Sequence, residues 1–225
     1  MSSDLSSCGD RVVKGIEARM LSPRDHYYPR FEGFIREIAG REIILDLGTY
    51  ASFRKELAPF RALLADKRYF TMGYRVRVEP GVTPPNLDGD IGALPFRTGA
   101  ADAVICKDVL EHVADPVRAI REMHRVLKPG GLLYCSVPFL HPYHGNRELP
   151  DFWRFTHEGL EVLFSPFADR TVVRTGGAVF VVKAFTPPLL ARVLFSAPLM
   201  PIANALDKLT LKRHACNMFL VFARK

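Results

Sequence analysis

The run from Leu94 to Gly131 holds, in order, the residues that a strand, a helix and a second strand require. Within it, the apolar run Ala103 to Cys106 is followed by the polar Asp108, which is typical of a short strand buried on both faces that ends in a loop. Asp115 and Pro116 match a helix N-cap followed by proline at the first helical position. The run therefore predicts a β-α-β unit, and such units build parallel sheets.

The helix after Pro116 is expected to be amphipathic. Apolar residues recur at spacings of three and four, which predicts one buried stripe made of Val117, Ile120, Met123 and Leu127. The sequence KPGG at 128–131 is expected to end this helix, so that the next strand runs from Leu132 to Val137.

The same patterns predict further elements along the chain. Strands are expected at 43–48, 68–72, 170–174 and 217–223. Helices are expected at 31–40, at 53–64 with an early break at Pro59, and from the cap Thr156 to Phe164. We expect the helix at 31–40 to lie over the sheet edge or over the mouth of a site.

The length of 225 residues predicts a single domain over 26–225, preceded by a small, polar tail at 1–25. A helical, apolar insertion is expected at about 176–210, before the last strand. Within it, 179–202 is interrupted by Lys183, Arg192 and prolines, which leaves uncharged runs too short for a spanning helix. Helices packed on the domain, a lid, an acceptor pocket and a peripheral contact with a membrane surface all suit this region.

The net charge and the spacing of the cysteines limit which partners and which cellular compartment we expect. A net charge of +7 suits an anionic partner or a solvated basic surface, but no basic run reaches five residues, so specific nucleic-acid binding is not expected. The cysteines Cys8, Cys106, Cys135 and Cys216 lie far apart, which indicates neither a disulfide framework nor structural zinc. Because no signal-peptide core follows the start, we expect a reducing, cytoplasmic setting.

Four motifs in order carry a resemblance to a known family: LDLG at 45–48, GDIGALPF at 89–96, DVLEHV at 108–113 and RVLKPGG at 125–131. Together they resemble the class I S-adenosylmethionine-dependent methyltransferases, in the small-molecule branch with the VLEHV motif. The resemblance covers about 41–164 and the last strand. It implies an α/β fold: a doubly wound, Rossmann-like, seven-stranded and mostly parallel sheet whose final strand is antiparallel.

The resemblance also implies S-adenosylmethionine as the cofactor and places its binding residues. Asp46 and Gly48 match the loop that approaches the amino acid end, where glycine permits close contact. Asp90 would accept a hydrogen bond from the adenine amino group, with Ile91 beside the ring, and Asp108 would lie near the methionine moiety and the transfer site. Helix capping or loop bonding is the alternative for Asp46 and Asp108.

Two departures from the family pattern concern this cofactor site. The usual G-x-G after the first strand is Gly48-Thr49-Tyr50 here, and the second strand ends at 70–74 without the acidic residue that holds the ribose, with Glu79 an uncertain substitute. Losing that charged contact would cost about 1.5–3 kcal/mol, roughly ten- to hundredfold in affinity. The alternative hypothesis is therefore a methyltransferase fold with weakened or lost cofactor binding, acting as a binding subunit or in other chemistry.

The acceptor site is expected at the loops after the fourth and fifth strands. Methyl transfer needs a base only for a hydroxyl or a protonated amine, and the candidates are His112, His141 and His144. Arg147, Trp153 and Arg154 are the candidates for binding the acceptor. A backbone contact of His112, packing of Trp153 and a cap or Glu158 pair of Arg154 are the structural alternatives.

The spacing of the histidines does not predict a metal site, because His141 and His144 have no third ligand type nearby in the sequence. A nicotinamide-dependent dehydrogenase is also disfavoured, because Gly48 stands alone where G-x-G-x-x-G is needed. The resemblance carried by the four motifs thus implies S-adenosylmethionine-dependent methyl transfer to a small-molecule, glycan or lipid-like acceptor.

Overall fold

The computed structural model describes residues 28–49, 55–74, 84–147, 149–194, 202, 205–206 and 215–225. The predictions that concern the tail at 1–25, Tyr50 and Glu79 lie outside these residues. The described strands are β1 (Ile43–Leu47), β2 (Arg68–Gly73), β3 (Leu87–Asp88), β4 (Ala101–Lys107), β5 (Leu127–Pro138), β6 (Asp169–Thr175) and β7 (Met218–Arg224).

These strands form one seven-stranded sheet in the order β3-β2-β1-β4-β5-β7-β6. The pairs from β3 to β5 are parallel, whereas β7 runs antiparallel to both β5 and β6. The predicted mostly parallel sheet with an antiparallel last strand is therefore confirmed. Because Leu47 pairs with Met72 and Cys106, and Cys106 pairs with Cys135, the carboxyl ends of four strands meet at one edge.

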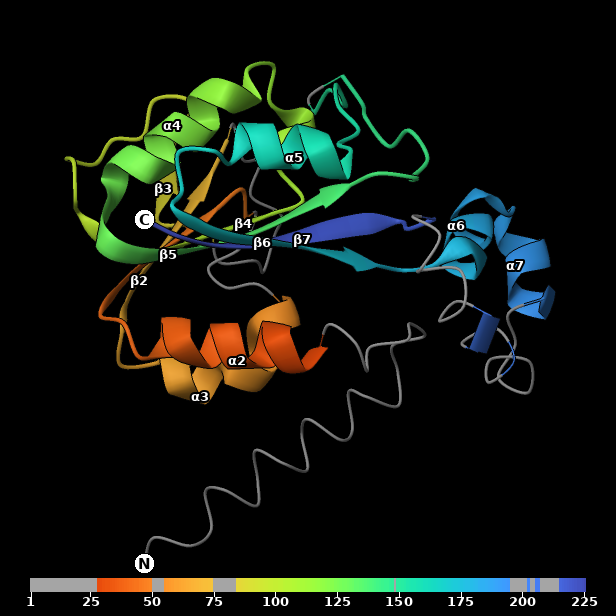
Figure 1. The fold of residues 1–225 in the computed structure, drawn as a ribbon, viewed down its shortest axis with the longest axis horizontal. Coiled ribbons are helices and arrows are strands. Elements are labelled where there is room, and N and C mark those ends of the chain that lie inside the picture. Colours follow the sequence, from red (N-terminus) through yellow and green to blue (C-terminus); the bar gives the residue numbers. More distant parts are fainter. Residues whose placement is uncertain are drawn as a thin grey trace, which may run out of the picture.

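Helices cover both faces of the sheet (Figure 1). The helical elements are α2 (Tyr28–Ala39), the 3₁₀ turns η2 (Lys55–Phe60) and η3 (Leu110–His112), α3 (Arg61–Leu64), α4 (Pro116–Val126), α5 (His157–Leu163), α6 (Ala178–Phe185) and α7 (Pro188–Leu194). Alternate residues of β1 serve the two faces, since Leu45 and Leu47 join the core under α4 and α5, while Ile44 joins the core over α2 and α3.

The position predicted for the helix at 31–40 is wrong. α2 lies flat on the sheet face opposite α4, where Ile35 and Ile38 are fully buried in the same core as Ile44. Phe31 adds ring contacts with Phe60 and with Tyr134. The apolar stripe of this helix is thus used to cover the sheet and leaves the carboxyl edge open.

The start of α4 is as predicted, and of the predicted buried stripe Ile120, Met123 and Leu127 are buried but Val117 is not. The Asp115 carboxylate accepts a hydrogen bond from the Arg118 amide at 2.9 Å, with Pro116 at the first helical position. Val117, however, is 47% exposed, and the buried residues are Ala119, Ile120, Met123 and Val126. At about 100° per residue, Val117 lies about 130° around the helix from the centre of that stripe.

The end of α4 also differs from the prediction. Leu127 takes an extended conformation (φ −71°, ψ 137°) and pairs with Ala101, so the helix ends at Val126 and the KPGG sequence lies inside β5. Gly130 bends the strand there with φ 72°, and its amide donates to the Lys225 carbonyl at 2.8 Å. The glycines therefore bend a strand next to the chain's last residue and do not terminate a helix.

The helices predicted at 53–64 and from Thr156 to Phe164 are present, but their bounds differ from the predicted ones. Pro59 lies inside the 3₁₀ turn η2, so the helix predicted at 53–64 is divided into η2 and α3. The Thr156 hydroxyl caps α5 by accepting from the Gly159 amide at 3.1 Å, and this helix ends at Leu163.

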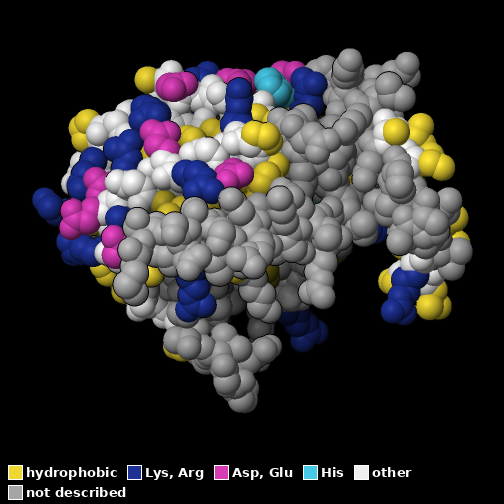
Figure 2. Space-filling model, turned by 90° about the horizontal axis from the view of Figure 1, so that it is seen from below, with side chains coloured by type: hydrophobic (Ala, Val, Ile, Leu, Met, Phe, Trp, Pro, Cys, Tyr) yellow, Lys and Arg dark blue, Asp and Glu magenta, His cyan; other side chains and the backbone are white. Residues whose placement is uncertain are grey.

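The apolar region after β6 forms α6 and α7, which lie at one end of the molecule in Figure 1. Their apolar side chains face outward in part, with Phe185 60% exposed and Leu189 79% exposed. No helix in the described part of the chain has the length and apolarity that crossing a membrane requires. On the face drawn in Figure 2, basic and acidic side chains are interspersed over the coloured surface.

Candidate active site

A cavity of about 460 Å³ opens at the carboxyl edge of the sheet. Its walls come from the turn after β1, the end of β2, the segment 89–92, the loop after β4 with the start of α4, and the residues Arg147, Leu149, Pro150 and Phe152. This is the edge at which open α/β sheets bind their ligands, and the volume suits a small-molecule site of about 300–1,000 Å³.

Four of the five residues predicted to bind the cofactor line this cavity: Gly48, Asp90, Ile91 and Asp108. The fifth, Asp46, does not. Its side chain is fully buried and accepts a hydrogen bond from the Tyr69 hydroxyl at 2.7 Å. Asp46 therefore helps to join β1 to β2 and lies outside the cavity lining.

Gly48 permits the close approach of two loops at the base of the cavity. Its φ is +75°, and a Cβ atom at this position would lie 2.1 Å from Cγ2 of Val109, which also lines the cavity. Any side chain here would have to displace Val109 as well as adopt a left-handed backbone.

Asp108 is held in place directly after β4. It has a positive φ of 54°, which is uncommon for a residue other than glycine, and its carboxylate accepts from the Ser136 hydroxyl at 2.6 Å. It also forms an ion pair with Lys107. β5 thus fixes the orientation of an acidic side chain on the neighbouring strand end.

The cavity wall at the end of β2 is formed by Gly73 and Tyr74, where the family pattern has a ribose-binding carboxylate. Among the described residues that line the cavity, the acidic ones are Asp90, Asp108 and Asp115. The position at which the sequence lacks the acidic residue of the family pattern thus lies in the cavity wall.

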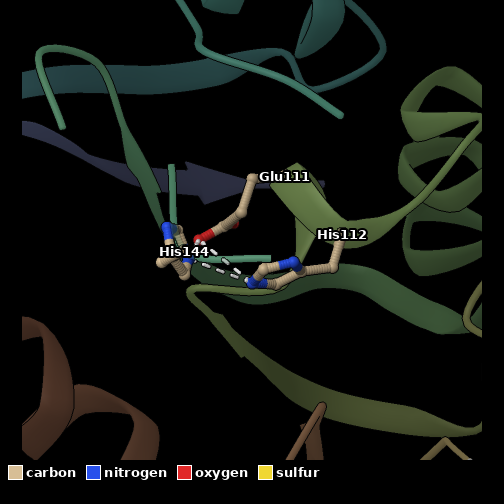
Figure 3. Close-up of side chains that lie close together, drawn as sticks. All are labelled: Glu111, His112 and His144. Atoms are coloured by element: carbon tan, nitrogen blue, oxygen red, sulfur yellow. Dashed lines mark hydrogen bonds and ion pairs between the residues drawn. The ribbon is translucent and has the colours of Figure 1, made fainter. Parts of the chain in front are cut away.

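Two of the three predicted base candidates meet at the edge of the cavity. The Nε2 atoms of His112 and His144 lie 3.2 Å apart, and Oε1 of Glu111 lies 4.0 and 3.9 Å from them (Figure 3). Of these three residues, His112 lines the cavity. His141 lies beside His144, with ring centroids 5.0 Å apart, but outside the lining.

The other nitrogen of each ring is held by an oxygen acceptor. Nδ1 of His112 lies 2.7 Å from the Pro150 carbonyl, which is the backbone contact given above as the structural alternative for His112. Nδ1 of His144 lies 3.2 Å from the carboxylate of Asp151, which also accepts from the His144 amide at 2.9 Å. These contacts orient both Nε2 atoms toward Glu111.

Arg154 has a structural position. It binds Asp151 through two hydrogen bonds of 2.5 and 2.7 Å and donates to the carbonyls of His141 and Pro142. These bonds hold the pKa of Asp151 well below its usual range. The guanidinium group of Arg154 pairs with Asp151 and not with Glu158. It stabilises the loop after β5, whereas the sequence predicted that it would bind the acceptor.

The remaining two acceptor candidates are separated by the structure. Arg147 lines the cavity, whereas Trp153 lies outside the lining and donates its indole N–H to the Val113 carbonyl at 2.8 Å. The apolar ring at the cavity is instead that of its neighbour Phe152.

Glu111 is the site residue that the sequence reasoning missed. It is 1% exposed, and burial raises the pKa of its carboxyl group to about 8, while burial lowers the pKa of His112. Its Oε2 atom has no hydrogen-bond partner among the described residues. A usable signal was present, because Glu111 and His112 follow β4, His144 follows β5, and these parallel strands are neighbours.

Comparisons with known proteins agree with this geometry. A family model described as a methyltransferase domain matches residues 71–135. A ubiquinone biosynthesis O-methyltransferase of Xanthomonas oryzae is 55% identical over 40 residues, which is 18% of this chain and 17% of the relative. A demethylmenaquinone methyltransferase of Renibacterium salmoninarum is 44% identical over 64 residues, or 27% of each protein. The chain thus spans only about a quarter or less of the length of these relatives.

Solved structures share the fold over most of the chain. An S-adenosylmethionine-dependent methyltransferase of Mesorhizobium loti superposes with a TM-score of 0.52 at 18% identity, covering 88% of this chain and 97% of the other. One of Archaeoglobus fulgidus gives 0.52 at 14% identity, covering 90% and 94%. The chain is therefore similar to a methyltransferase domain over residues 71–135 and shares its fold with S-adenosylmethionine-dependent methyltransferases.

Proposed function

We propose that this protein transfers a methyl group from S-adenosylmethionine to a hydroxyl group of a small-molecule or lipid-like acceptor. The observation that carries this proposal is the cavity at the carboxyl edge, which brings together Gly48, Asp90, Ile91 and Asp108 from four separate segments. These are the residues that the family resemblance assigns to the cofactor.

The cavity suits a nucleoside with an amino acid tail. Gly48 and Val109 both line the cavity, and Ile91 offers an apolar surface for a ring. Asp90 can accept from an adenine amino group, and Asp108, held by Ser136, can bind the amino acid end. When bound, S-adenosylmethionine supplies a methyl group on a sulfonium that is activated for displacement.

The chain's own contribution is positioning and a proton acceptor. Alignment of the acceptor oxygen with the methyl carbon can contribute several kcal/mol. As the carbon–oxygen bond forms and the carbon–sulfur bond breaks, the hydroxyl proton must leave, and His112 lies in the cavity wall to receive it. With Nδ1 donating to the Pro150 carbonyl, the lone pair of His112 is on Nε2.

The acceptor class is supported by the relatives and by the surface. One relative is named as a ubiquinone biosynthesis O-methyltransferase and another as a demethylmenaquinone methyltransferase, and both names support a quinone-type acceptor. Arg147 in the cavity wall can bind an acidic group of the acceptor. The exposed apolar side chains of α6 and α7 suit a peripheral contact with a membrane surface from which such an acceptor comes.

Calorimetric titration tests the cofactor part of this proposal. We expect S-adenosylmethionine and S-adenosylhomocysteine to bind with micromolar affinity, and Asp90→Asn to weaken both by at least tenfold. Absence of heat and of a thermal shift at millimolar ligand would refute it. Transfer of a labelled methyl group to hydroxylated quinone precursors then tests the acceptor class.

The alternative, a methyltransferase fold with weakened cofactor binding, is favoured by one observation: Gly73 and Tyr74 form the cavity wall where the ribose carboxylate is expected. Under this alternative, the double variant Tyr50→Gly with Gly73→Asp should create or strengthen binding of S-adenosylhomocysteine. Micromolar binding by the unaltered chain would contradict it.

A further inference from the structure

The contacts of His112 and His144 determine which ring nitrogen carries the proton and which carries the lone pair. Each Nδ1 atom faces oxygens that can only accept, so each Nδ1 carries a proton. For His112 this is the Pro150 carbonyl, and for His144 these are the Pro142 carbonyl at 3.3 Å and the Asp151 carboxylate at 3.2 Å. In the neutral rings both Nε2 atoms then present lone pairs to each other across 3.2 Å. This arrangement is repulsive unless a proton or a cation lies between them.

Glu111 adds a carboxylate to the same point. Figure 3 shows its side chain directed toward the two rings, from the turn that also carries His112, while His144 comes from the loop after β5. Its Oε2 atom is buried without a hydrogen-bond partner in the described part of the structure, and its Oε1 atom faces both Nε2 atoms without reaching either at hydrogen-bond distance. A single shared proton would leave this buried carboxyl group unsatisfied.

The spacing of the three atoms matches a metal ion. A circle through atoms that are 3.2, 3.9 and 4.0 Å apart has a radius of about 2.2 Å, so one point lies at that distance from all three. Zinc binds histidine nitrogen at about 2.0–2.1 Å and carboxylate oxygen at about 2.0–2.2 Å. Shifts of one or two tenths of an ångström would complete the geometry.

We propose that Glu111, His112 and His144 bind one divalent transition-metal ion of the zinc type at the edge of the cavity. Two imidazoles and one carboxylate are a ligand set that such ions favour, and three protein ligands leave a position for water or substrate. Hydrogen-bond partners that orient the two rings are also present, as in known metal sites: the Pro150 carbonyl beside His112, and Asp151, which Arg154 holds, beside His144.

The metal would bind the acceptor oxygen, which is an extension that rests on the proposed function. His112 lies in the cavity wall, so an ion on its Nε2 atom is within reach of an acceptor there. A metal-bound hydroxyl loses its proton more readily. His112 would then act as a ligand, and the proton would leave to solvent or to another base.

Zinc titration of the chelator-treated full-length protein, without cofactor or acceptor, tests the site itself. We expect one Zn²⁺ per chain, a rise in the unfolding temperature, and at least tenfold weaker binding in His112→Gln and His144→Gln. The matched control is His157→Gln, because His157 lies at the start of α5 against Phe219, and it should bind zinc as the unaltered chain does. Circular dichroism checks that each variant is folded.

The proposal is overturned if the unaltered chain takes up no zinc or cobalt, or if the folded double variant His112→Gln with His144→Gln takes up as much. The second outcome would assign the metal to other groups, such as the cysteines. Because the titration contains no S-adenosylmethionine, its result is independent of whether the methyl transfer itself is found.

Discussion

At the scale of single residues, Gly48 and Glu111 determine what the site can do. Gly48 has to lack a side chain both for its backbone conformation and for the space that Val109 occupies. Glu111 is buried beside two histidines without a hydrogen-bond partner of its own for Oε2 among the described residues. Neither property follows from residue type alone, because each depends on a loop from a neighbouring strand.

The two requirements at Gly48 can be separated by comparing it with Gly99. Both have a positive φ, 75° and 65°, but a Cβ atom on Gly99 would meet nothing within 4 Å. We expect Gly99→Ala to lower the free energy of unfolding by about 1–2 kcal/mol through backbone strain, and Gly48→Ala to lower it further. Urea unfolding measures both.

Calorimetry on the same pair tests the site. Gly48→Ala should weaken S-adenosylhomocysteine binding at least tenfold, whereas Gly99→Ala should leave it unchanged. Equal affinities in the two variants would show that the contact with Val109 is unimportant for the ligand.

Asp151 should govern the affinity for zinc through His144. Asp151→Asn keeps the shape but removes the charge that holds Nδ1 of His144, and loss of such a group lowers metal affinity about 10–100-fold. Asp102→Asn is the control, because that carboxylate pairs with Lys128 away from the cluster. Unchanged zinc affinity in Asp151→Asn would contradict the assigned role.

At the scale of elements, α4 is tied to the segment that forms one wall of the cavity. Glu122 accepts from the Leu94 amide at 2.9 Å, and Arg125 binds both Glu122 and the carbonyls of Leu94 and Phe96. This network fixes the connection from β3 to β4 directly after Asp90 and Ile91.

The network predicts a pH-dependent contribution to stability. The hydrogen bond from Arg125 lowers the pKa of Glu122. A carboxylate with a lowered pKa in the folded state stabilises the protein above the unfolded pKa of about 4.3, and this contribution is lost as the pH falls through the folded value. Glu122→Gln should therefore cost about 1 kcal/mol at pH 7 and progressively less below about pH 4.

Urea unfolding at pH 7 and at about pH 3 measures this difference, with the exposed Glu158→Gln as the control. A cost of Glu122→Gln that stays constant over this range would contradict the assigned interaction.

Most of the elements could be predicted from the sequence, because buried strands and capped helices leave local patterns. The β1, β2, β4 and β7 strands and the cap at Asp115 are of this kind. The end of α4 was mispredicted because Leu127 is apolar in either structure, and only its pairing with Ala101 places it in a strand. The position of Asp46 and the meeting of Glu111 with His144 required the register of neighbouring strands, which no local pattern contains.

At the scale of the whole molecule, the carboxyl edge of the sheet carries two features of different character. The first is the cavity, and the second is the helix pair α6 and α7, which follows β6 at this same edge and exposes Val182, Phe185, Leu189, Leu190 and Leu194. With a net charge of +7, this combination suits a surface that is both anionic and apolar.

Vesicle binding tests this surface. We expect the protein to be retained by vesicles that contain anionic lipid, and Phe185→Ser with Leu189→Ser to reduce retention severalfold without lowering stability, since both side chains are more than half exposed. Glu158→Gln, which lies on α5, should behave as the unaltered chain does. Equal retention of the unaltered chain and the double variant by these vesicles would rule out α6 and α7 as the membrane contact.

The central claim, that the cavity at the carboxyl edge holds the cofactor, is tested most directly by a crystal structure grown with S-adenosylhomocysteine at millimolar concentration. We predict density for the nucleoside beside Asp90 and Ile91, with its amino acid end between Gly48 and Asp108. A cavity that remains empty under these conditions, or is filled by the chain's own side chains, would contradict the account.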